Sequence, residues 1–161
     1  MISDKIKNIT QLKSTVAGLK RKGKKIVFTN GCFDLLHYGH VKYLQDAKRA
    51  GDILIVAVNS DSSVKKIKGS RRPIVNLNFR LGALASLESV DYVTSFSEET
   101  PLNLIKSIKP DVLVKGADWN RKIIVGAEVV RNYGGEVTTI KLVKGLSTSN
   151  LIKRIARLSK E

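Results

Sequence analysis

Residues 25–43 read KIVFTNGCFDLLHYGHVKY, and this stretch decides the fold. Its first part, KIVFTNG, is a short β-rich apolar run of the kind that forms a buried strand. The segment from about His40 to Ala50 has helical spacing and stops at Gly51. A strand followed by a loop and a helix predicts one unit of an alternating α/β chain. The chain has only two histidines, His37 and His40, and both lie where this helix begins.

The same alternation continues on both sides of this stretch. Apolar residues recur at helical spacing over residues 6–19, and Gly23 follows as a stop. Further apolar runs lie at 53–60, 92–96, 111–115 and 136–142, and helical patterns lie at 77–87, 100–108, 123–133 and from 147 onward. Parallel strands need crossover connections, which are usually helices. The pattern therefore predicts an α/β fold, a doubly wound Rossmann-like three-layer sandwich with a five-stranded parallel sheet.

The chain shows no sign of an internal boundary, since it has no repeat, low-complexity tract or linker-like segment. We expect a single domain over residues 1–161, with an N-terminal helix at 1–22 and a core at 24–155. No apolar run approaches the ~20 residues of a membrane span, and the N-terminus lacks the apolar segment of a signal peptide. The single cysteine, Cys32, excludes an internal disulfide. These features predict a soluble, cytoplasmic protein without membrane insertion.

Positive charge dominates the composition, with 29 Lys and Arg against 14 Asp and Glu. Such an excess attracts anions of any kind, so a nucleic-acid-binding module is one hypothesis. The basic clusters lack the interleaved aromatic side chains that stack on bases, and we therefore expect no nucleic-acid partner. The middle cluster, KKIKGSRRP at residues 65–73, follows a predicted strand, and we expect it to form a flexible cover over a site. Lys68, Arg71 and Arg72 are its candidates for gripping a phosphate.

Ligands of doubly wound sheets bind beyond the carboxyl ends of the strands. Four segments follow predicted strands at that edge: 30–40, 59–72, 115–120 and 144–150. All four contain polar or basic residues, which predicts a phosphate-binding crevice.

The two histidines lie at a predicted helix N-terminus, where unpaired N–H groups and the helix dipole favour anions. Two imidazoles three residues apart can face one phosphate, and Gly39 leaves room for a ligand. Nucleotidyl transfer fits this arrangement, because the attacking phosphate is already ionised and needs aligned hydrogen-bond donors rather than a base. Two other interpretations are that the histidines cap and pack the loop, or that Cys32, His37 and His40 bind zinc without an evident fourth ligand.

The segment TNGCFDLLHYGH resembles the HxGH signature of the cytidylyltransferase-like nucleotidyltransferases. Longer agreement, through VKGADW and GLSTSNLIKRI, is most similar to the heptose 1-phosphate adenylyltransferases and runs from about Lys24 to Ile155. The resemblance implies that ATP and D-glycero-D-manno-heptose 1-phosphate are joined by in-line attack on the α-phosphate, giving ADP-heptose and pyrophosphate. It also implies Mg²⁺ carried by the triphosphate, no metal held by the protein alone, and a homodimer or larger homo-oligomer.

The resemblance also assigns roles to residues at the strand ends. The implied catalytic residues are His37, His40, Lys68 and Arg80. The implied nucleotide-binding residues are Asn30, Gly31, Cys32, Phe33, Gly39, Lys115, Gly116, Asp118, Ser147, Thr148 and Ser149. The expected substrate-binding residues are Asp34, which by resemblance also braces the loop, and Arg71 and Arg72 of the basic cluster, which would grip the sugar phosphate or the triphosphate. By resemblance Trp119 contacts the base or the sugar, and the alternative is that this tryptophan is simply partly buried.

One position departs from the related cytidylyltransferases, which place an arginine shortly before the Ser/Thr motif. This chain has Leu142 and Val143 there, which leaves Lys141 or Lys144 as a substitute. Within the same enzyme class, a cytidylyltransferase acting on glycerol 3-phosphate or a related alcohol phosphate stays open as an alternative. The choice between adenine and cytosine depends on the shape of the pocket, which spacing does not reveal.

Overall fold

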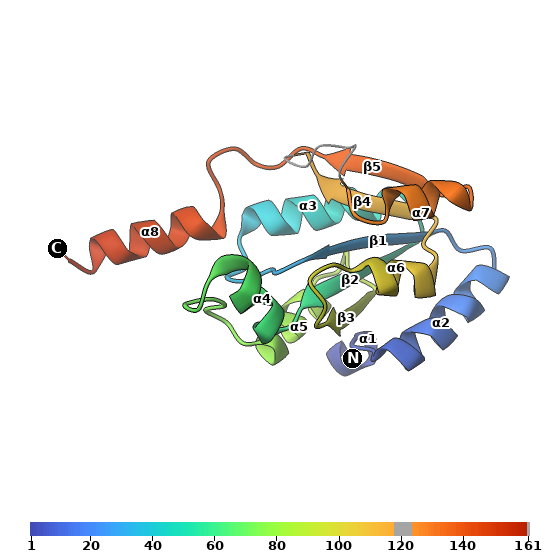
Figure 1. Ribbon diagram of the computed structural model, residues 1–161, viewed down its shortest axis with the longest axis horizontal. Helices are drawn as coiled ribbons and strands as arrows, with labels where there is room; N and C mark the ends of the chain where they lie inside the picture. Colours follow the sequence, from blue (N-terminus) through green and yellow to red (C-terminus); the bar gives the residue numbers. More distant parts are fainter. Residues whose placement is uncertain (118–123, 161) are drawn as a thin grey trace.

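Five parallel strands form one sheet in the structure, a computed structural model that describes residues 1–117 and 124–160 (Figure 1). The strands are β1 (Ile26–Gly31), β2 (Ile53–Asn59), β3 (Tyr92–Phe96), β4 (Val112–Gly116) and β5 (Glu136–Ile140). Their order is β3-β2-β1-β4-β5, so the chain winds outward from β1 to one edge and then from β4 to the other. This arrangement confirms the predicted doubly wound α/β fold.

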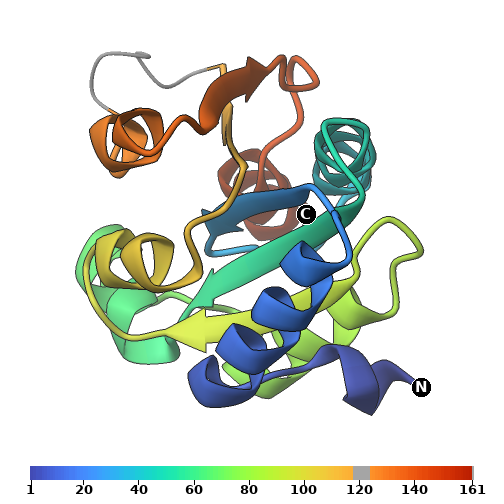
Figure 2. The same cartoon turned by 90° about the vertical axis from the view of Figure 1, so that its right-hand side faces the viewer.

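Helices cover both faces of the sheet, which makes three layers. The bounds of the covering helices are α3 (Tyr38–Lys48) and α5 (Leu77–Ala85) on one face, and α2 (Ile9–Arg21), α6 (Leu102–Ile108) and α7 (Ala127–Asn132) on the other. Figure 2 shows α3 and α6 on opposite sides of the strands. Neighbouring strand residues face opposite layers, since Val27 packs with α3 and Phe28 with α2. Because both faces are buried, the strands read as continuous apolar runs.

The N-terminal segment differs from the single helix that the sequence predicts for residues 1–22. Helix α1 (Ile2–Lys5) stops before Ile6, which forms a parallel bridge with Val93 of the edge strand β3. Helix α2 then begins after Asn8, whose side chain accepts a hydrogen bond from the Gln11 N–H. The prediction was wrong because Asn8 is a strong N-cap and the edge strand offers unpaired backbone groups to the passing chain.

The basic cluster after β2 is partly helical, whereas the sequence analysis expects a flexible cover over residues 65–73. Helix α4 (Asp61–Lys68) is capped by Ser60, whose hydroxyl accepts from the Ser63 N–H, and it buries Val64. Its lysines lie in the last turn, where the helix dipole favours cations. The expectation was therefore wrong for residues 65–68, and only residues 69–75 form a loop that leads to α5.

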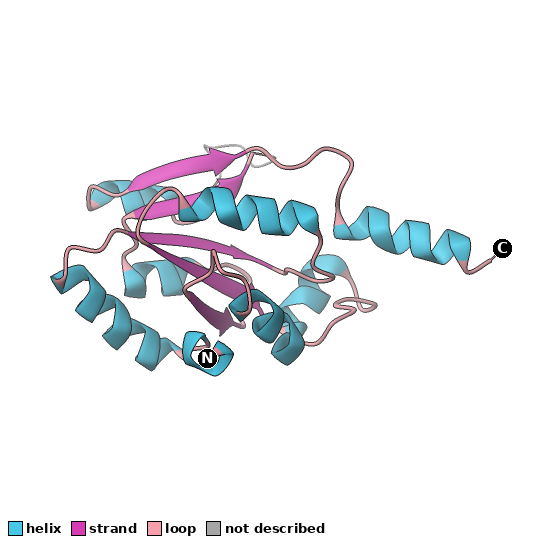
Figure 3. Cartoon of the chain, turned by 180° about the vertical axis from the view of Figure 1, so that it is seen from behind, coloured by secondary structure: helices cyan, strands magenta, loops and turns pink. Residues whose placement is uncertain are grey.

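The last helix, α8 (Thr148–Leu158), extends away from the body of the molecule (Figures 1 and 3). None of its residues is buried, and Ile155 and Leu158 are exposed. The segment that leads into α8 crosses the carboxyl edge of the sheet, so only the start of the helix is near the other strand ends. Across the described residues, no helix combines the length and the apolar character that crossing a bilayer requires.

Candidate active site

A cavity of about 520 Å³ opens at the carboxyl ends of the strands. Its volume lies within the range of roughly 300–1,000 Å³ that small-ligand sites occupy. The lining comes from the ends of β1, β2 and β4, from the segments that follow all five strands and from the start of α8. The predicted site residues that line it are Asn30, Gly31, Cys32, Phe33, Asp34, His37, Gly39, His40, Lys68, Arg72, Lys115, Gly116, Ser147, Thr148 and Ser149. The tertiary structure thus brings most of the predicted site into one cavity, while Asp118 and Trp119 lie outside the described residues.

The two imidazole rings stack on each other at the start of α3. Their centroids are 3.9 Å apart and their planes differ by 20°. His37 is the N-cap residue, yet its side chain makes no capping hydrogen bond. Both of its ring nitrogens, and Nδ1 of His40, lack a hydrogen-bond partner among the described residues. The rings therefore pack in the loop but do not cap the helix, and these nitrogens have hydrogen-bonding capacity left for a ligand.

Burial keeps both imidazoles neutral at neutral pH. Desolvation lowers the pKa of His37 below its ordinary value. Desolvation first, and then the neighbouring His37, lower the pKa of His40 to about 4, although Asp34 opposes the shift. A neutral imidazole still donates one hydrogen bond, and a bound polyanion favours the protonated form. The pair can therefore donate to phosphate oxygens and gain charge when a triphosphate arrives.

We expect the free energy of unfolding to fall as the pH drops from about 6.5 toward 4, because in this pH range His40 is neutral in the folded state and protonated in the unfolded state. An unfolded histidine binds a proton below about 6.5, whereas folded His40 stays neutral down to about 4. The unfolded state binds more protons in this window and is therefore favoured. Allowing for solvent screening at the open cavity, the loss should be about 2 kcal/mol.

Urea unfolding measured between about pH 7 and pH 4.5 tests this expectation when wild type is compared with His40→Asn. Over this pH range the variant should lose about 2 kcal/mol less stability than wild type, because it lacks the His40 contribution. The pH dependence that comes from the carboxyl groups is common to both proteins and cancels in the difference. Identical pH slopes for the two proteins would contradict the assignment of the low pKa to His40.

The loop between β1 and α3 is strained and internally braced. Phe33 and Leu35 have positive φ angles, 46° and 23°, which side-chain-bearing residues rarely adopt. Between them, the buried carboxylate of Asp34 accepts hydrogen bonds from the backbone N–H groups of Ile74 and Val75, and from Nε of Arg72 at 2.7 Å. Burial would raise the pKa of Asp34, but these donors outweigh it and hold the pKa below its usual value. The structure thus shows how Asp34 braces the loop, and its oxygens are already engaged.

Two glycines make room for the rings that surround the histidines. A Cβ on Gly31 would lie 3.0 Å from the Phe33 ring, which meets His40 edge-on at a centroid distance of 5.4 Å. A Cβ on Gly39 would lie 3.0 Å from the His37 ring and 3.5 Å from Leu146. The sequence analysis attributes Gly39 to the approach of a ligand, whereas the structure gives it a second reason, the placement of His37.

Three predicted cations line the cavity, two from the segment after β2 and one from β4. Lys68 lies at the end of α4, Arg72 in the loop that follows it, and Lys115 at the end of β4. Lys115 is buried and donates from Nζ to the Asn30 side chain at the end of β1. Positive charge from the β2 and β4 ends of the sheet therefore lines the cavity and favours an anionic ligand.

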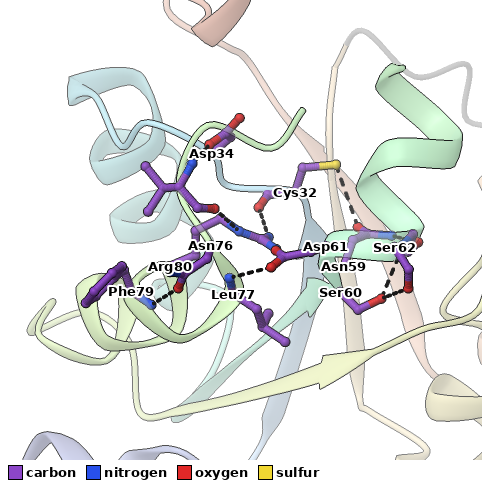
Figure 4. A network of polar contacts seen from close by, with 12 residues as sticks. Cys32, Asp34, Asn59, Ser60, Asp61, Ser62, Asn76, Leu77, Phe79 and Arg80 are labelled. Carbon is purple, nitrogen blue, oxygen red and sulfur yellow. Dashed lines mark hydrogen bonds and ion pairs between the residues drawn. The ribbon is translucent and has the colours of Figure 1, made fainter. Parts of the chain in front are cut away.

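Two predicted arginines do not line the cavity. Arg71 is exposed, whereas Arg80 is only 1% exposed and lies beneath the loop after β1. Figure 4 shows the Arg80 guanidinium directed at the Cys32 carbonyl and the Asp61 carboxylate. A third hydrogen bond joins the Arg80 side chain to the Val75 carbonyl, so all three acceptors belong to the protein. Their geometry differs from the expected direct contact of Arg80 with phosphate.

The far wall of the cavity comes from the segment before α8. Ser147 is the N-cap, and its hydroxyl accepts from the Asn150 N–H at 3.1 Å. Thr148 and Ser149 also line the cavity, where the N–H groups of the first turn favour an anion. Leu142 and Val143, which stand where related enzymes have an arginine, line the cavity as well, whereas neither Lys141 nor Lys144 does.

Sequence reasoning did not single out several further lining residues. These are Tyr43, Glu99, Thr100, Pro101 and Val125, which lie outside the four predicted segments. Asn59, Ile67 and Leu146 also line the cavity, and they fall within the predicted segments 59–72 and 144–150. Glu99 and Thr100 lie in a loop held by the Ser63 hydroxyl, which donates to the Glu98 carbonyl at 3.1 Å. That contact joins residues far apart in sequence, and no local pattern predicts it.

In residues 1–117 and 124–160, no group of three His, Cys, Asp or Glu side chains is placed so that it could hold a metal ion. The Cys32 thiol instead approaches the Asn59 side chain at 4.0 Å, and burial raises its pKa. The zinc interpretation of Cys32, His37 and His40 is therefore unsupported. Glu99 is the only lining carboxylate besides the engaged Asp34 among these residues. Such a donor set fits Mg²⁺ that arrives on a triphosphate with its own waters better than a protein cage.

Comparison with known sequences identifies a family over most of the chain. The profile of the family described as cytidylyltransferase-like matches residues 28–156. The chain is 52% identical over 153 residues to the bifunctional protein HldE of Geobacter metallireducens, and 56% identical over 150 residues to that of Aliarcobacter butzleri. These matches cover 95% and 93% of this chain but only 31% of each relative.

Solved structures agree with the family and the fold. A lipopolysaccharide core biosynthesis protein from Thermoplasma volcanium is 30% identical, with a TM-score of 0.61, and the match covers 76% of this chain and 98% of that one. A pantoate-beta-alanine ligase from Francisella tularensis, in complex with a form of ATP and beta-alanine, is 19% identical with a TM-score of 0.62 and covers 94% of this chain and 78% of that one. The second likeness concerns the fold alone.

Proposed function

Since this chain belongs to the cytidylyltransferase-like family, we propose that it is an adenylyltransferase that joins ATP to D-glycero-D-manno-heptose 1-phosphate. The single observation that carries the proposal is the stacked pair of His37 and His40, which have unpartnered nitrogens beside a cavity with cations on several sides. Similarity to HldE proteins and to a lipopolysaccharide core biosynthesis protein supports the heptose substrate. The product would be ADP-heptose, and pyrophosphate would leave.

In the proposed reaction, a phosphate oxygen of the sugar phosphate attacks the α-phosphorus of ATP. A new O–P bond forms as the bond between the α-phosphorus and its bridging oxygen to the β-phosphate breaks. The attacking oxygen is already ionised, so no base has to remove a proton. The protein's task is to align the two phosphates and to stabilise charge on the α-phosphate oxygens and on the departing pyrophosphate.

The residues divide this task by position. His37 and His40 donate to the triphosphate from the start of α3, and the first turn of α8 receives the terminal phosphates through Ser147, Thr148 and Ser149. Lys68 and Arg72 come from the segment that borders the cavity on the α4 side and hold the sugar phosphate against the α-phosphate. Mg²⁺ on the triphosphate would neutralise part of its charge when bound.

A substrate panel tests the proposal. ATP, CTP, GTP and UTP are each offered with heptose 1-phosphate and with glycerol 3-phosphate, and pyrophosphate release is measured. We expect kcat/KM for ATP with the heptose to exceed that of any other pair by at least ~100-fold, because buried polar groups left unpaired by a wrong base are costly.

Each other outcome of the panel overturns the proposal in a specific way. Preference for CTP with glycerol 3-phosphate would make the protein a cytidylyltransferase of the same family. Absence of pyrophosphate release from every pair, together with salt-sensitive binding of DNA or RNA, would favour the nucleic-acid-binding hypothesis that the net charge of +15 raises.

A further inference from the structure

Arg80 is the largest fully buried side chain among the described residues, and its hydrogen bonds join three separate segments. Nη1 donates to the Cys32 carbonyl at 2.6 Å, Nη2 to Asp61 Oδ1 at 2.7 Å and Nε to the Val75 carbonyl at 2.9 Å. Oδ2 of Asp61 in turn accepts from the Leu77 N–H. Burying a charged guanidinium costs free energy unless its N–H groups are hydrogen-bonded and its charge is paired. These bonds and the Asp61 carboxylate supply the partners, and they hold the side chain in one orientation.

The contact with the Cys32 carbonyl fixes the orientation of one peptide in the β1–α3 loop. The only cis peptide bond among the described residues is Arg72–Pro73, so the peptide between Cys32 and Phe33 is trans. In a trans peptide the C=O and the N–H point in opposite directions. The Cys32 carbonyl points toward Arg80, and Arg80 does not line the cavity. Cys32 and Phe33 do line it. The N–H of Phe33 is therefore turned toward the cavity side.

Two further observations agree with an N–H held ready for a ligand. The Phe33 N–H makes no hydrogen bond to another of the described residues. Phe33 itself has a φ of 46°, a conformation that costs about 1–3 kcal/mol and persists only where surrounding contacts enforce it. Arg80 on one side and the braced Asp34 on the other supply those contacts.

We propose that Arg80 is a positioning residue, whose hydrogen bond to the Cys32 carbonyl holds the Cys32–Phe33 peptide so that the Phe33 N–H donates to an α-phosphate oxygen in the transition state. The family resemblance already implies that backbone amides around Cys32 and Phe33 approach the phosphates, and the new element is the role of Arg80. This inference rests on the function proposed above, and it gives Arg80 an indirect role in place of the expected direct contact with phosphate. The Phe33 N–H lies on the side of the loop opposite Arg80. It would act beside the two imidazoles as a further hydrogen-bond donor to the phosphate. Because the donor is fixed before the substrate binds, it needs no reorganisation as charge develops.

Arg80→Lys tests the inference, because lysine keeps the charge but cannot reach all three acceptors at once. We expect kcat to fall about 100-fold, as for loss of one oxyanion donor, with KM for ATP changed less than about threefold. Asp61→Asn is the second variant, which keeps the arginine and weakens its anchor, and it should lower kcat by about tenfold. Arg49→Lys is the matched control, since Arg49 is 77% exposed and pairs with Asp46 at the other end of α3.

A direct readout comes from ¹H–¹⁵N spectra of the Phe33 amide as ATP is added without the sugar phosphate. In wild type and Arg49→Lys the Phe33 amide proton should shift downfield on binding. In Arg80→Lys that shift should vanish and in Asp61→Asn it should shrink, while the Ser149 amide responds as in wild type. A role confined to stability would leave the shift intact in folded protein.

The outcomes separate this inference from the proposed function. If wild type transfers adenylyl groups and the Phe33 amide of Arg80→Lys still responds as in wild type, the positioning role is wrong. If wild type transfers none but the amide response depends on Arg80, the proposed reaction is wrong and the positioning of a nucleotide-binding N–H stands. If Arg80→Lys does not fold, an unchanged kcat and amide response in Asp61→Asn overturn the inference.

Discussion

Replacing either histidine with alanine should lower kcat by about three powers of ten, or about 4 kcal/mol of transition-state stabilisation, while the protein stays folded. The two rings stack at 3.9 Å beside the cavity, and their unpartnered nitrogens mean that replacing either ring breaks none of the hydrogen bonds of those atoms within the described residues. Their removal takes away donors to the oxygens that gain charge in the transition state. Steady-state kinetics for His37→Ala and His40→Ala, with thermal unfolding of both, measure this expectation.

The double variant and a conservative substitution provide the controls. Since the stacked rings act on one triphosphate as a unit, the double variant should lose much less than the product of the two single losses. His37→Gln keeps a donor and should retain more activity than His37→Ala. Folded alanine variants with kcat within about threefold of wild type would contradict a role for the pair in catalysis.

Replacing Asp34 with alanine should destabilise the fold by about 3–5 kcal/mol, the largest loss of stability that we expect from one substitution. The carboxylate is only 1% exposed and accepts from Arg72 and from two consecutive backbone N–H groups. Its removal leaves those donors buried without an acceptor, and it also releases the strained loop that carries the histidines. Urea unfolding, extrapolated to water, measures the loss.

Two further variants sharpen the interpretation. Asp34→Asn should lose nearly as much, because the amide has one acceptor oxygen and its NH₂ group would face donors. Asp46→Ala is the matched control, since Asp46 pairs on the surface of α3 with Lys42 and Arg49, and it should lose about 1 kcal/mol or less. Similar losses for Asp34→Ala and Asp46→Ala would contradict the bracing role.

Errors in the sequence analysis lie where tertiary contacts compete with local pattern. The helix expected over residues 1–22 is interrupted because Ile6 pairs with Val93, which is distant in sequence. The cover expected over residues 65–73 begins as helix α4, since Ser60 caps it and Val64 finds a buried site. The family resemblance implies Arg80 at the phosphates, whereas in the structure its three acceptors are protein atoms from separate segments.

The sequence by itself determined the five apolar strands, their parallel winding and the edge at which the cavity opens, because these depend on periodicity and on the rule that crossovers are helical. It also determined that both histidines stand at the start of α3, since the loop that carries them is local. Only the tertiary structure decided which charged side chains face the cavity and which are paired with other groups of the protein. Arg80 and the Asp34–Arg72 ion pair hold the loop, while Lys68 and Lys115 border the cavity. The physical reason is that the position of a charged side chain depends on partners supplied by distant segments, and hydrophobic periodicity carries no information about them.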